Sequence, residues 1–349
     1  MQITFLVGNG FDISCGIDTS YRSFYNWYIK QDSSSEVIKK FKEDIKSDLI
    51  GKGKRWADFE SGLGQFSKNF TKETVDDFIE IYEDAHESII TYIESERNKY
   101  KDSIDVPESL ASLKDGILNF SQELTPAEQD VIAKIKAADQ GNETIVKFIS
   151  FNYTNTLDIC VKELSKSPLK IWKNNGAERR YYVSPSVLHI HGTLNHYPIL
   201  GVGEEYQFAN KDLLSCPGVS EIMVKSKSVK TMGEHWYSDA AKEIKNSRII
   251  CVWGMSLGDT DSTWWGEIAE WLKLDETRQL IIFWRTKTPP NGKSVYRYVS
   301  EKAKVVERLM QFTDFTNETI NNVRNRIHVV YNTEKVLRVS FSTKEEIKV

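Results

Sequence analysis

The chain has 349 residues, which is enough for one large α/β domain with insertions or for two domains. Its 46 basic and 50 acidic residues nearly cancel, so the formal net charge of −4 provides no basic surface that would hold a nucleic-acid backbone. The four cysteines have no paired spacing, which argues against zinc and redox motifs and predicts free, buried thiols.

The sequence predicts a reduced, cytoplasmic protein. A strand pattern begins at residue 2, which leaves no room for a secretory leader. No apolar run approaches the ~18 residues that a membrane helix needs. We therefore expect no membrane partner.

The first predicted element is a strand over residues 3–7, and a glycine loop follows it directly. Because Gly8 and Gly10 lack a Cβ, the backbone can turn sharply there and approach an anion, toward which a following helix would direct its free N–H groups. Gly16, however, falls six residues after Gly10, whereas in the usual dinucleotide fingerprint the third glycine falls three residues after the second. Taken alone, these residues leave a phosphate-binding loop and a tight structural turn equally open.

Residues 31–144 show helical patterns and no strand pattern. Between Thr71 and Tyr100, apolar residues recur at helical spacing among charged ones, which predicts an amphipathic helix. We expect a single α/β nucleotide-binding domain over 1–349, with a discontinuous core (1–30 and 145–349) and a helical insertion over about 31–144.

The insertion is a candidate for contacts in a homo-oligomer or for gating of a site. Residues 197–236 are a second candidate, as a lid over the site. Burial of the apolar helix faces inside one subunit is the competing explanation.

Strand patterns return after residue 144. They cover residues 145–150, 187–190, 248–253, 279–284 and 326–331. Several of these segments are short, apolar and β-branched, as buried parallel strands are, and their connections are long enough for crossover helices. The pattern predicts a doubly wound, mainly parallel, Rossmann-like α/β sheet. The alternating residues 336–341 predict an edge strand or a tail that pairs with a partner.

Glycine or polar residues follow four of the predicted strands. These segments are residues 8–12, 151–156, 191–193 and 254–259. In open α/β sheets, ligands bind beyond the carboxyl ends of the strands. We therefore expect the glycine loop, Asn152, His191 and Ser256 to surround one crevice, and we predict a small-molecule nucleotide site there.

Two of these side chains suit catalysis. Asn152 faces the predicted crevice, although it also suits the cap of a helix that starts near Thr154. His191, at a strand end and followed by glycine, can reach a ligand and act as a general base, whereas His189 lies within the strand and is interpreted as structural.

The fourth segment leaves two assignments open. Asp259 and Asp261 suit either the cap of the following helix or the hydroxyl groups of a ribose. Trp264, Trp265 and Trp271 come soon after, and aromatic residues of this kind belong to the core or stack on a base.

Four sequence blocks carry a resemblance to a known family. They are residues 8–12, 151–154, 189–192 and 254–259. With these blocks in this order, the chain closely resembles the AbiH family of bacterial phage abortive-infection proteins over nearly the whole strand framework. It also resembles a diverged member of the wider SIR2-like family, where a glycine loop, a strand-end Asn, a His-Gly pair and a Gly-x-Ser loop surround NAD.

The SIR2-like resemblance implies a catalytic role for Asn152 and His191. It implies that the dinucleotide is held by Gly8, Asn9, Gly10, Phe11, Asp12, Gly16, Arg22, Thr154, Gly254, Ser256 and Asp259. The zinc-binding cysteine pairs of protein deacetylases are missing, which argues against deacylation. Asp12 stands where many SIR2-like loops carry serine, and Asn9 replaces a small residue.

Defence members of the SIR2-like group hydrolyse NAD, so the leading expectation is an NAD glycohydrolase that needs no metal. Its expected partners are NAD as substrate, a phage-derived trigger and further copies of itself. One alternative is a nucleotide-binding sensor without catalysis. The other is a Mg²⁺-dependent phosphoesterase with oxygen ligands from Asp12, Asp158, Asp259 and Asp261.

Overall fold

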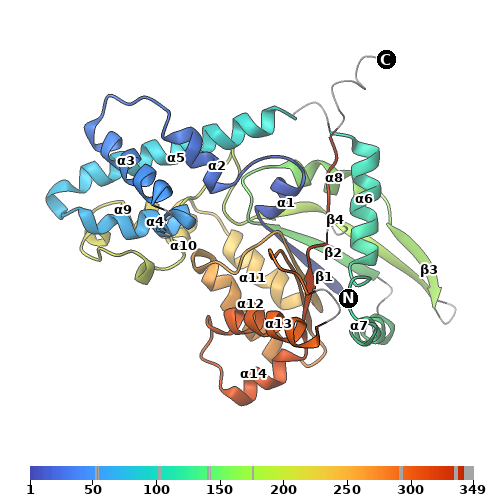
Figure 1. Ribbon diagram of the computed structural model, residues 1–349. Helices are drawn as coiled ribbons and strands as arrows, with labels where there is room; N and C mark the ends of the chain where they lie inside the picture. Colours follow the sequence, from blue (N-terminus) through green and yellow to red (C-terminus); the bar gives the residue numbers. More distant parts are fainter. Residues whose placement is uncertain are drawn as a thin grey trace, which may run out of the picture.

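The computed structural model describes residues 1–51, 53, 55–100, 104–139, 141, 143–174, 177–290, 294–333 and 337–341. Within these residues the chain builds one seven-stranded sheet in the order β3-β4-β2-β1-β5-β6-β7 (Figure 1). The strands are β1 (Gln2–Val7), β2 (Glu143–Ser150), β3 (Lys170–Asn174), β4 (Ala177–His189), β5 (Ile249–Trp253), β6 (Gln279–Trp284) and β7 (Ile327–Tyr331). Strands β3 and β4 pair antiparallel, and all other neighbours pair parallel.

The order of the strands reverses beside β1. From β1 the chain proceeds outward through β2 to β4 on one side, and it then returns to place β5, β6 and β7 on the other side. Such a reversal is a topological switch point, and open α/β sheets bind ligands beyond the carboxyl ends of the strands there. The predicted mainly parallel, Rossmann-like sheet is confirmed.

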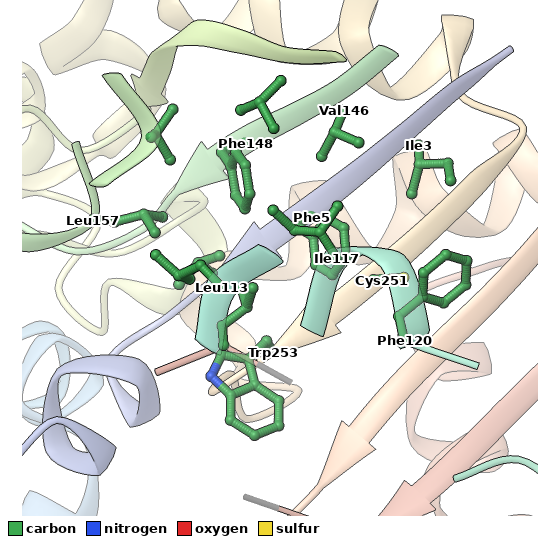
Figure 2. Close-up of a cluster of buried hydrophobic side chains, with 14 of the residues drawn as sticks. Ile3, Phe5, Leu113, Ile117, Phe120, Val146, Phe148, Leu157, Cys251 and Trp253 are labelled. Carbon is green, nitrogen blue, oxygen red and sulfur yellow. The ribbon is translucent and has the colours of Figure 1, made fainter. Parts of the chain in front are cut away.

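Helices cover both faces of the sheet. One face carries α6 (Val106–Asn119), α7 (Pro126–Ala138) and α8 (Thr156–Leu164). Figure 2 shows Leu113 and Ile117 of α6 among the sheet side chains Phe5 and Phe148, whose rings stack with centroids 5.5 Å apart. The other face carries α11 (Trp236–Asn246), α12 (Ser262–Leu274), α13 (Val295–Met310) and α14 (Asn317–Arg324). The sheet is therefore doubly wound, as the sequence predicts.

A group of helices lies beside the sheet, on the left in Figure 1. It consists of α2 (Tyr21–Tyr28), α3 (Glu36–Ile50), α4 (Phe59–Phe66), α5 (Val75–Asn98), α9 (Val219–Met223) and α10 (Lys225–Thr231). Apolar side chains of α2, α3, α4, α5 and α9 form a third hydrophobic cluster rich in aromatic rings, and α10 packs on α9. At least these faces are therefore buried within one subunit. The helix predicted between Thr71 and Tyr100 is confirmed as α5. We call this group the helical layer.

The helical layer and the predicted insertion are not the same set of residues. Helices α6 and α7 lie in the insertion but pack on the sheet. Helices α2 and α9 lie outside the insertion but pack in the helical layer, and α10, also outside it, packs on α9. The division of the chain into independently folding units stays a prediction.

Two strand predictions needed correction. The strand expected at 187–190 is the end of β4, which begins ten residues earlier at Ala177, and its antiparallel partner β3 was not predicted. Charged residues around Arg180 hide the strand pattern because this part of the sheet faces solvent.

The prediction of an edge strand, or of a tail that pairs with a partner, at 336–341 is wrong for residues 337–341. Leu337 and Val339 are buried in the core, and the amide of Val339 donates a hydrogen bond to Sγ of Cys15 at 3.3 Å. Phe341 forms an isolated antiparallel bridge to Ile104. The alternating pattern therefore reflects burial of every second residue. Val336 lies outside the described residues.

All four cysteines are free, and three of them are buried, while Cys216 is partly exposed. The predicted free thiols are thus confirmed. In the described ranges, no helix is both long and apolar enough to cross a membrane.

Candidate active site

Four strands end in one row. Ser150 of β2 is in register with Val7 of β1 and with His189 of β4, and Val7 is in register with Trp253 of β5. The loops that leave these strands therefore lie side by side at the switch point. Together with the helical layer they line a cavity of ≈ 350 Å³, a size typical of small-molecule sites. We call it the first cavity.

Most of the predicted site residues line the first cavity. They are Gly8, Asn9, Gly10, Asp12, Asn152, Thr154, His191, Gly254 and Ser256. The other four lie elsewhere. Phe11 is buried in the hydrophobic core, Gly16 and Arg22 are exposed, and Asp259 forms an ion pair with Arg308 at 2.9 Å.

The glycine loops after β1 and β5 pack backbone against backbone. A Cβ on Gly10 would lie 2.7 Å from Cα of Gly254, and one on Gly254, whose φ is +68°, would lie 2.5 Å from the amide nitrogen of Phe11. The amide of Gly8 donates to the Trp253 carbonyl at 2.9 Å, and that of Gly10 donates to the Gly254 carbonyl at 2.7 Å. Glycine is required here for close approach of the two loops.

This packing changes the expected role of the first loop. Because the amides of Gly8 and Gly10 already donate to carbonyl groups, these two do not face an anion as the sequence analysis expected. Helix α1 (Gly10–Ser14), which follows, has only five residues. Asn9 instead holds the loop in place, since its side chain exchanges hydrogen bonds with Thr19. Binding of a diphosphate by this loop stays a prediction.

Asn152 presents an acceptor without a partner. Its Nδ2 donates to the Gly8 carbonyl at 3.1 Å, and its buried Oδ1 has no hydrogen-bond partner. It is not a helix cap, because α8 begins at Thr156 with Asn155 in the cap position. A buried acceptor of this kind is satisfied when a ligand hydroxyl or a water donates to it.

The two neighbouring histidines have different surroundings. Nδ1 of His189 lies 3.0 Å from the Asn152 carbonyl, and its Nε2 lies 3.0 Å from Oδ2 of Asp158. Burial lowers the pKa of His189, but the hydrogen bond and the charge of Asp158 raise it by more than that. The pKa of His189 is therefore above its usual value. His189 thus fixes the loop that carries Asn152.

His191 lines the first cavity and is 4% exposed. Burial, and then the charge of Lys225, lower its pKa to about 3, so the imidazole is neutral at pH 7. Its Nε2 has no hydrogen-bond partner and lies 3.5 Å from Oδ1 of Asp261. A neutral imidazole with a free nitrogen is able to accept a proton from a ligand.

An ion cluster around the buried Lys225 lines the first cavity. Nζ of Lys225 lies 2.7 Å from Oε2 of Glu60 and 3.2 Å from Oδ1 of Asp261, and Lys225 is 1% exposed. Burial lowers the pKa of Lys225, but the charges of Asp261 and Glu60 raise it above its usual value. Burial also raises the pKa of Glu60 to about 7, against the charge of Lys225.

Sequence reasoning missed Lys225 and Glu60. Both lie in the helical layer, where charged residues of an amphipathic pattern are normally assigned to the solvent face. One local signal exists, since Glu60 lies between the apolar residues Phe59 and Leu63. Lys225 lies in the segment predicted as a lid, and closure by that segment stays a prediction.

Asp12 joins two of the loops. The Thr154 hydroxyl lies 2.8 Å from each of its carboxylate oxygens. Burial raises the pKa of Asp12 to about 7, although the hydrogen bond from Thr154 opposes this shift. The carboxyl group is therefore partly protonated at neutral pH.

The carboxylates expected to hold Mg²⁺ do not converge. Asp12 contacts Thr154, Asp158 contacts His189, Asp259 pairs with Arg308, and Asp261 pairs with Lys225. The part of the chain that the structure describes contains no group of three or more His, Cys, Asp or Glu side chains placed to hold a metal ion. Among the described residues, the phosphoesterase alternative lacks the ligand cluster that it requires.

A family model described as Bacteriophage abortive infection AbiH matches residues 4–283. The chain belongs to the AbiH family. The matched range includes every residue that lines the first cavity of this AbiH protein. No curated protein and no solved structure matches the chain. The SIR2-like resemblance stays a prediction.

Proposed function

We propose that this AbiH-family protein acts in phage defence by hydrolysing NAD to nicotinamide and ADP-ribose. The family supports a role in abortive infection. The observation that carries the proposed chemistry is the pair of unpartnered buried atoms, Asn152 Oδ1 and His191 Nε2, which line one cavity at the switch point of a doubly wound sheet.

The charges around the first cavity suit this reaction. When the bond between nicotinamide and ribose breaks, its electron pair stays with the nicotinamide nitrogen, and positive charge develops on the ribose. Asp58, Glu60 and Asp261 line the cavity, so carboxylates are available to stabilise that charge. Lys225 holds two of these carboxylates in place.

The two unpartnered atoms have complementary roles in this proposal. Oδ1 of Asn152 accepts a hydrogen bond from the attacking water or from a ribose hydroxyl, which orients it. Nε2 of His191 accepts the proton that the water loses as its oxygen bonds to the ribose carbon.

One observation favours a second candidate, a nucleotide-binding sensor. With a pKa of about 3, His191 is a weak base in the ligand-free protein. Such a site holds a nucleotide without consuming it unless ligand binding or a phage trigger raises this pKa. The two candidates therefore differ in turnover and share the binding site.

The test measures NAD and nicotinamide over time with purified protein, with and without extract from infected cells. Removal of the proton acceptor in His191→Ala should lower the rate about 10²- to 10⁴-fold. Asn152→Ala is expected to act in the same direction. The control is His196→Ala, since that imidazole is mainly exposed and pairs with Glu234. Binding of NAD without consumption under both conditions would reject hydrolysis and favour the sensor.

A further inference from the structure

A second cavity of ≈ 790 Å³ lies on the other side of the contact between the glycine loops. Gly10, Gly254, Met255 and Ser256 line both cavities and form their shared wall. Beyond this wall the second cavity extends past the carboxyl ends of β5, β6 and β7, where Arg285 follows β6.

Hydrogen-bond donors distinguish the second cavity. Arg285 and Arg338 line it, and neither forms an ion pair with another described residue. No acidic side chain belongs to its described lining. The first cavity, in contrast, is lined by four acidic side chains, including Asp12 and Asp58, against a single lysine.

A buried hydrogen-bond donor that lines the second cavity has no partner of its own. Trp253 is 6% exposed and lines the second cavity, and its indole Nε1 has no hydrogen-bond acceptor. Its ring packs edge-on against Phe283 with centroids 5.5 Å apart, and Figure 2 shows it at the border of the hydrophobic cluster. Buried donors are nearly always satisfied, so this N–H group points to an acceptor on a ligand.

Asn332 fixes the turn that carries Arg285 after β6. It has a left-handed φ of +49°, and its side chain accepts from the Thr286 amide at 2.7 Å and donates to the Thr286 carbonyl at 2.8 Å. Its own amide donates to the Trp284 carbonyl at 3.0 Å. Arg285 lies between Trp284 and Thr286, so these hydrogen bonds position its backbone before any ligand binds. A strained residue at such a place is typical of binding sites.

We infer that the second cavity binds a phosphate monoester at the adenosine end of the dinucleotide, so that the preferred substrate is NADP. This inference rests on the proposed function. A dinucleotide that crosses the shared wall places its cationic nicotinamide among the carboxylates of the first cavity. Its adenosine end then reaches Arg285 and Arg338.

The charge of the adenosine end decides between the two dinucleotides. NAD and NADP share the anionic diphosphate, but in NAD the 2′ position of the adenosine ribose carries only an uncharged hydroxyl group. The 2′-phosphate of NADP supplies three acceptor oxygens and nearly two negative charges, which suit the planar donor groups of arginine.

The test compares kcat/KM for NADP and NAD in the wild type, Arg285→Gln and Arg338→Gln. Because a hydrogen bond to a charged group contributes about 1.5–3 kcal/mol, each substitution should lower the ratio of kcat/KM for NADP to that for NAD about 10-fold. The control is Arg324→Gln, an exposed arginine on α14 that lines neither cavity. A wild type that uses both dinucleotides equally, or variants with an unchanged ratio, would overturn the inference while leaving hydrolysis intact.

A binding measurement keeps the inference testable without turnover. Calorimetry with 2′-phospho-ADP-ribose and with ADP-ribose should show preference for the phosphorylated compound in the wild type and its loss in both arginine variants. If neither dinucleotide is consumed, the proposed function fails, and this preference alone decides the role of the arginines. Equal affinity for the two compounds would reject that role.

Discussion

The two cavities share a wall of glycine backbone but differ in how their charges are satisfied. In the first cavity, the charges of Lys225, Glu60 and Asp261 are paired with one another inside the protein. In the second, Arg285 and Arg338 are exposed and have no ion-pair partner among the described residues. A buried charge must be paired within the fold because burial without a partner is costly, whereas an exposed one keeps its charge for a ligand.

The cavities also differ in what builds them. The sheet supplies the row of strand ends to both, but the helical layer closes only the first, through Glu60 on α4 and Lys225 on α10. A doubly wound sheet thus provides a crevice beyond its strand ends, and the added helices place the ion cluster of Lys225 on one side of it.

The largest expected effect concerns the ion cluster, which belongs to the first cavity alone. Lys225→Met leaves the buried Glu60 and the partly buried Asp261 without their cation and should lower the free energy of unfolding by about 3–5 kcal/mol, measured by denaturant titration. In Lys225→Met/Glu60→Gln, part of this loss should be recovered. The control is Lys227→Met, since Lys227 pairs with Glu205 at the surface and should contribute less than about 1 kcal/mol. Equal effects of the two lysines would contradict the buried pairing.

The shared wall gives the next effect. Gly254→Ala introduces a left-handed alanine whose Cβ overlaps the Phe11 amide, and it should lower the free energy of unfolding by about 2–4 kcal/mol. Gly218→Ala is the matched control, because Gly218 has φ +82° and its Cβ would meet nothing within 4 Å. It should cost only about 1–2 kcal/mol. Loss of ligand binding in both cavities of Gly254→Ala would support the common wall, and loss in one alone would argue against it.

The last effect depends on pH and is the smallest when it is expressed per pH unit. Because the pKa of Asp12 is raised to about 7, the stability from its protonated form is present in full below the ordinary pKa of 3.8 and is lost as pH rises through 7. Asparagine at position 12 cannot ionise. The unfolding free energy of Asp12→Asn minus that of the wild type should therefore increase by at most about 1.4 kcal/mol per pH unit as the pH rises from 4 to 7.

Asp18→Asn is the control for this pH dependence. Partial burial raises the pKa of Asp18, but hydrogen bonds from Ser23 and Ser20 lower it by more. The contribution of Asp18 to the free energy of unfolding therefore changes only below pH 4. The difference between Asp18→Asn and the wild type should stay constant between pH 4 and 7. An equally constant difference for Asp12→Asn would show that the Asp12 carboxyl is ionised throughout.

Several parts of the fold and site could be read from the sequence because they depend on local patterns. Buried parallel strands are runs of apolar residues, and polar residues at their ends mark the ligand edge of the sheet. This reasoning placed Asn152, His191 and Ser256 around one cavity. It failed for β3 and for residues 337–341, where solvent exposure or packing on the core overrides the local pattern.

By itself, the sequence determined a doubly wound sheet, the residues at its strand ends and membership of the AbiH family. Only the tertiary structure showed that Gly10 and Gly254 are small because two loops meet there. It also brought Glu60 and Lys225 together from positions 165 residues apart. The pairing of buried charges depends on which helix faces meet in space, and neither glycine spacing nor hydrophobic periodicity encodes that contact.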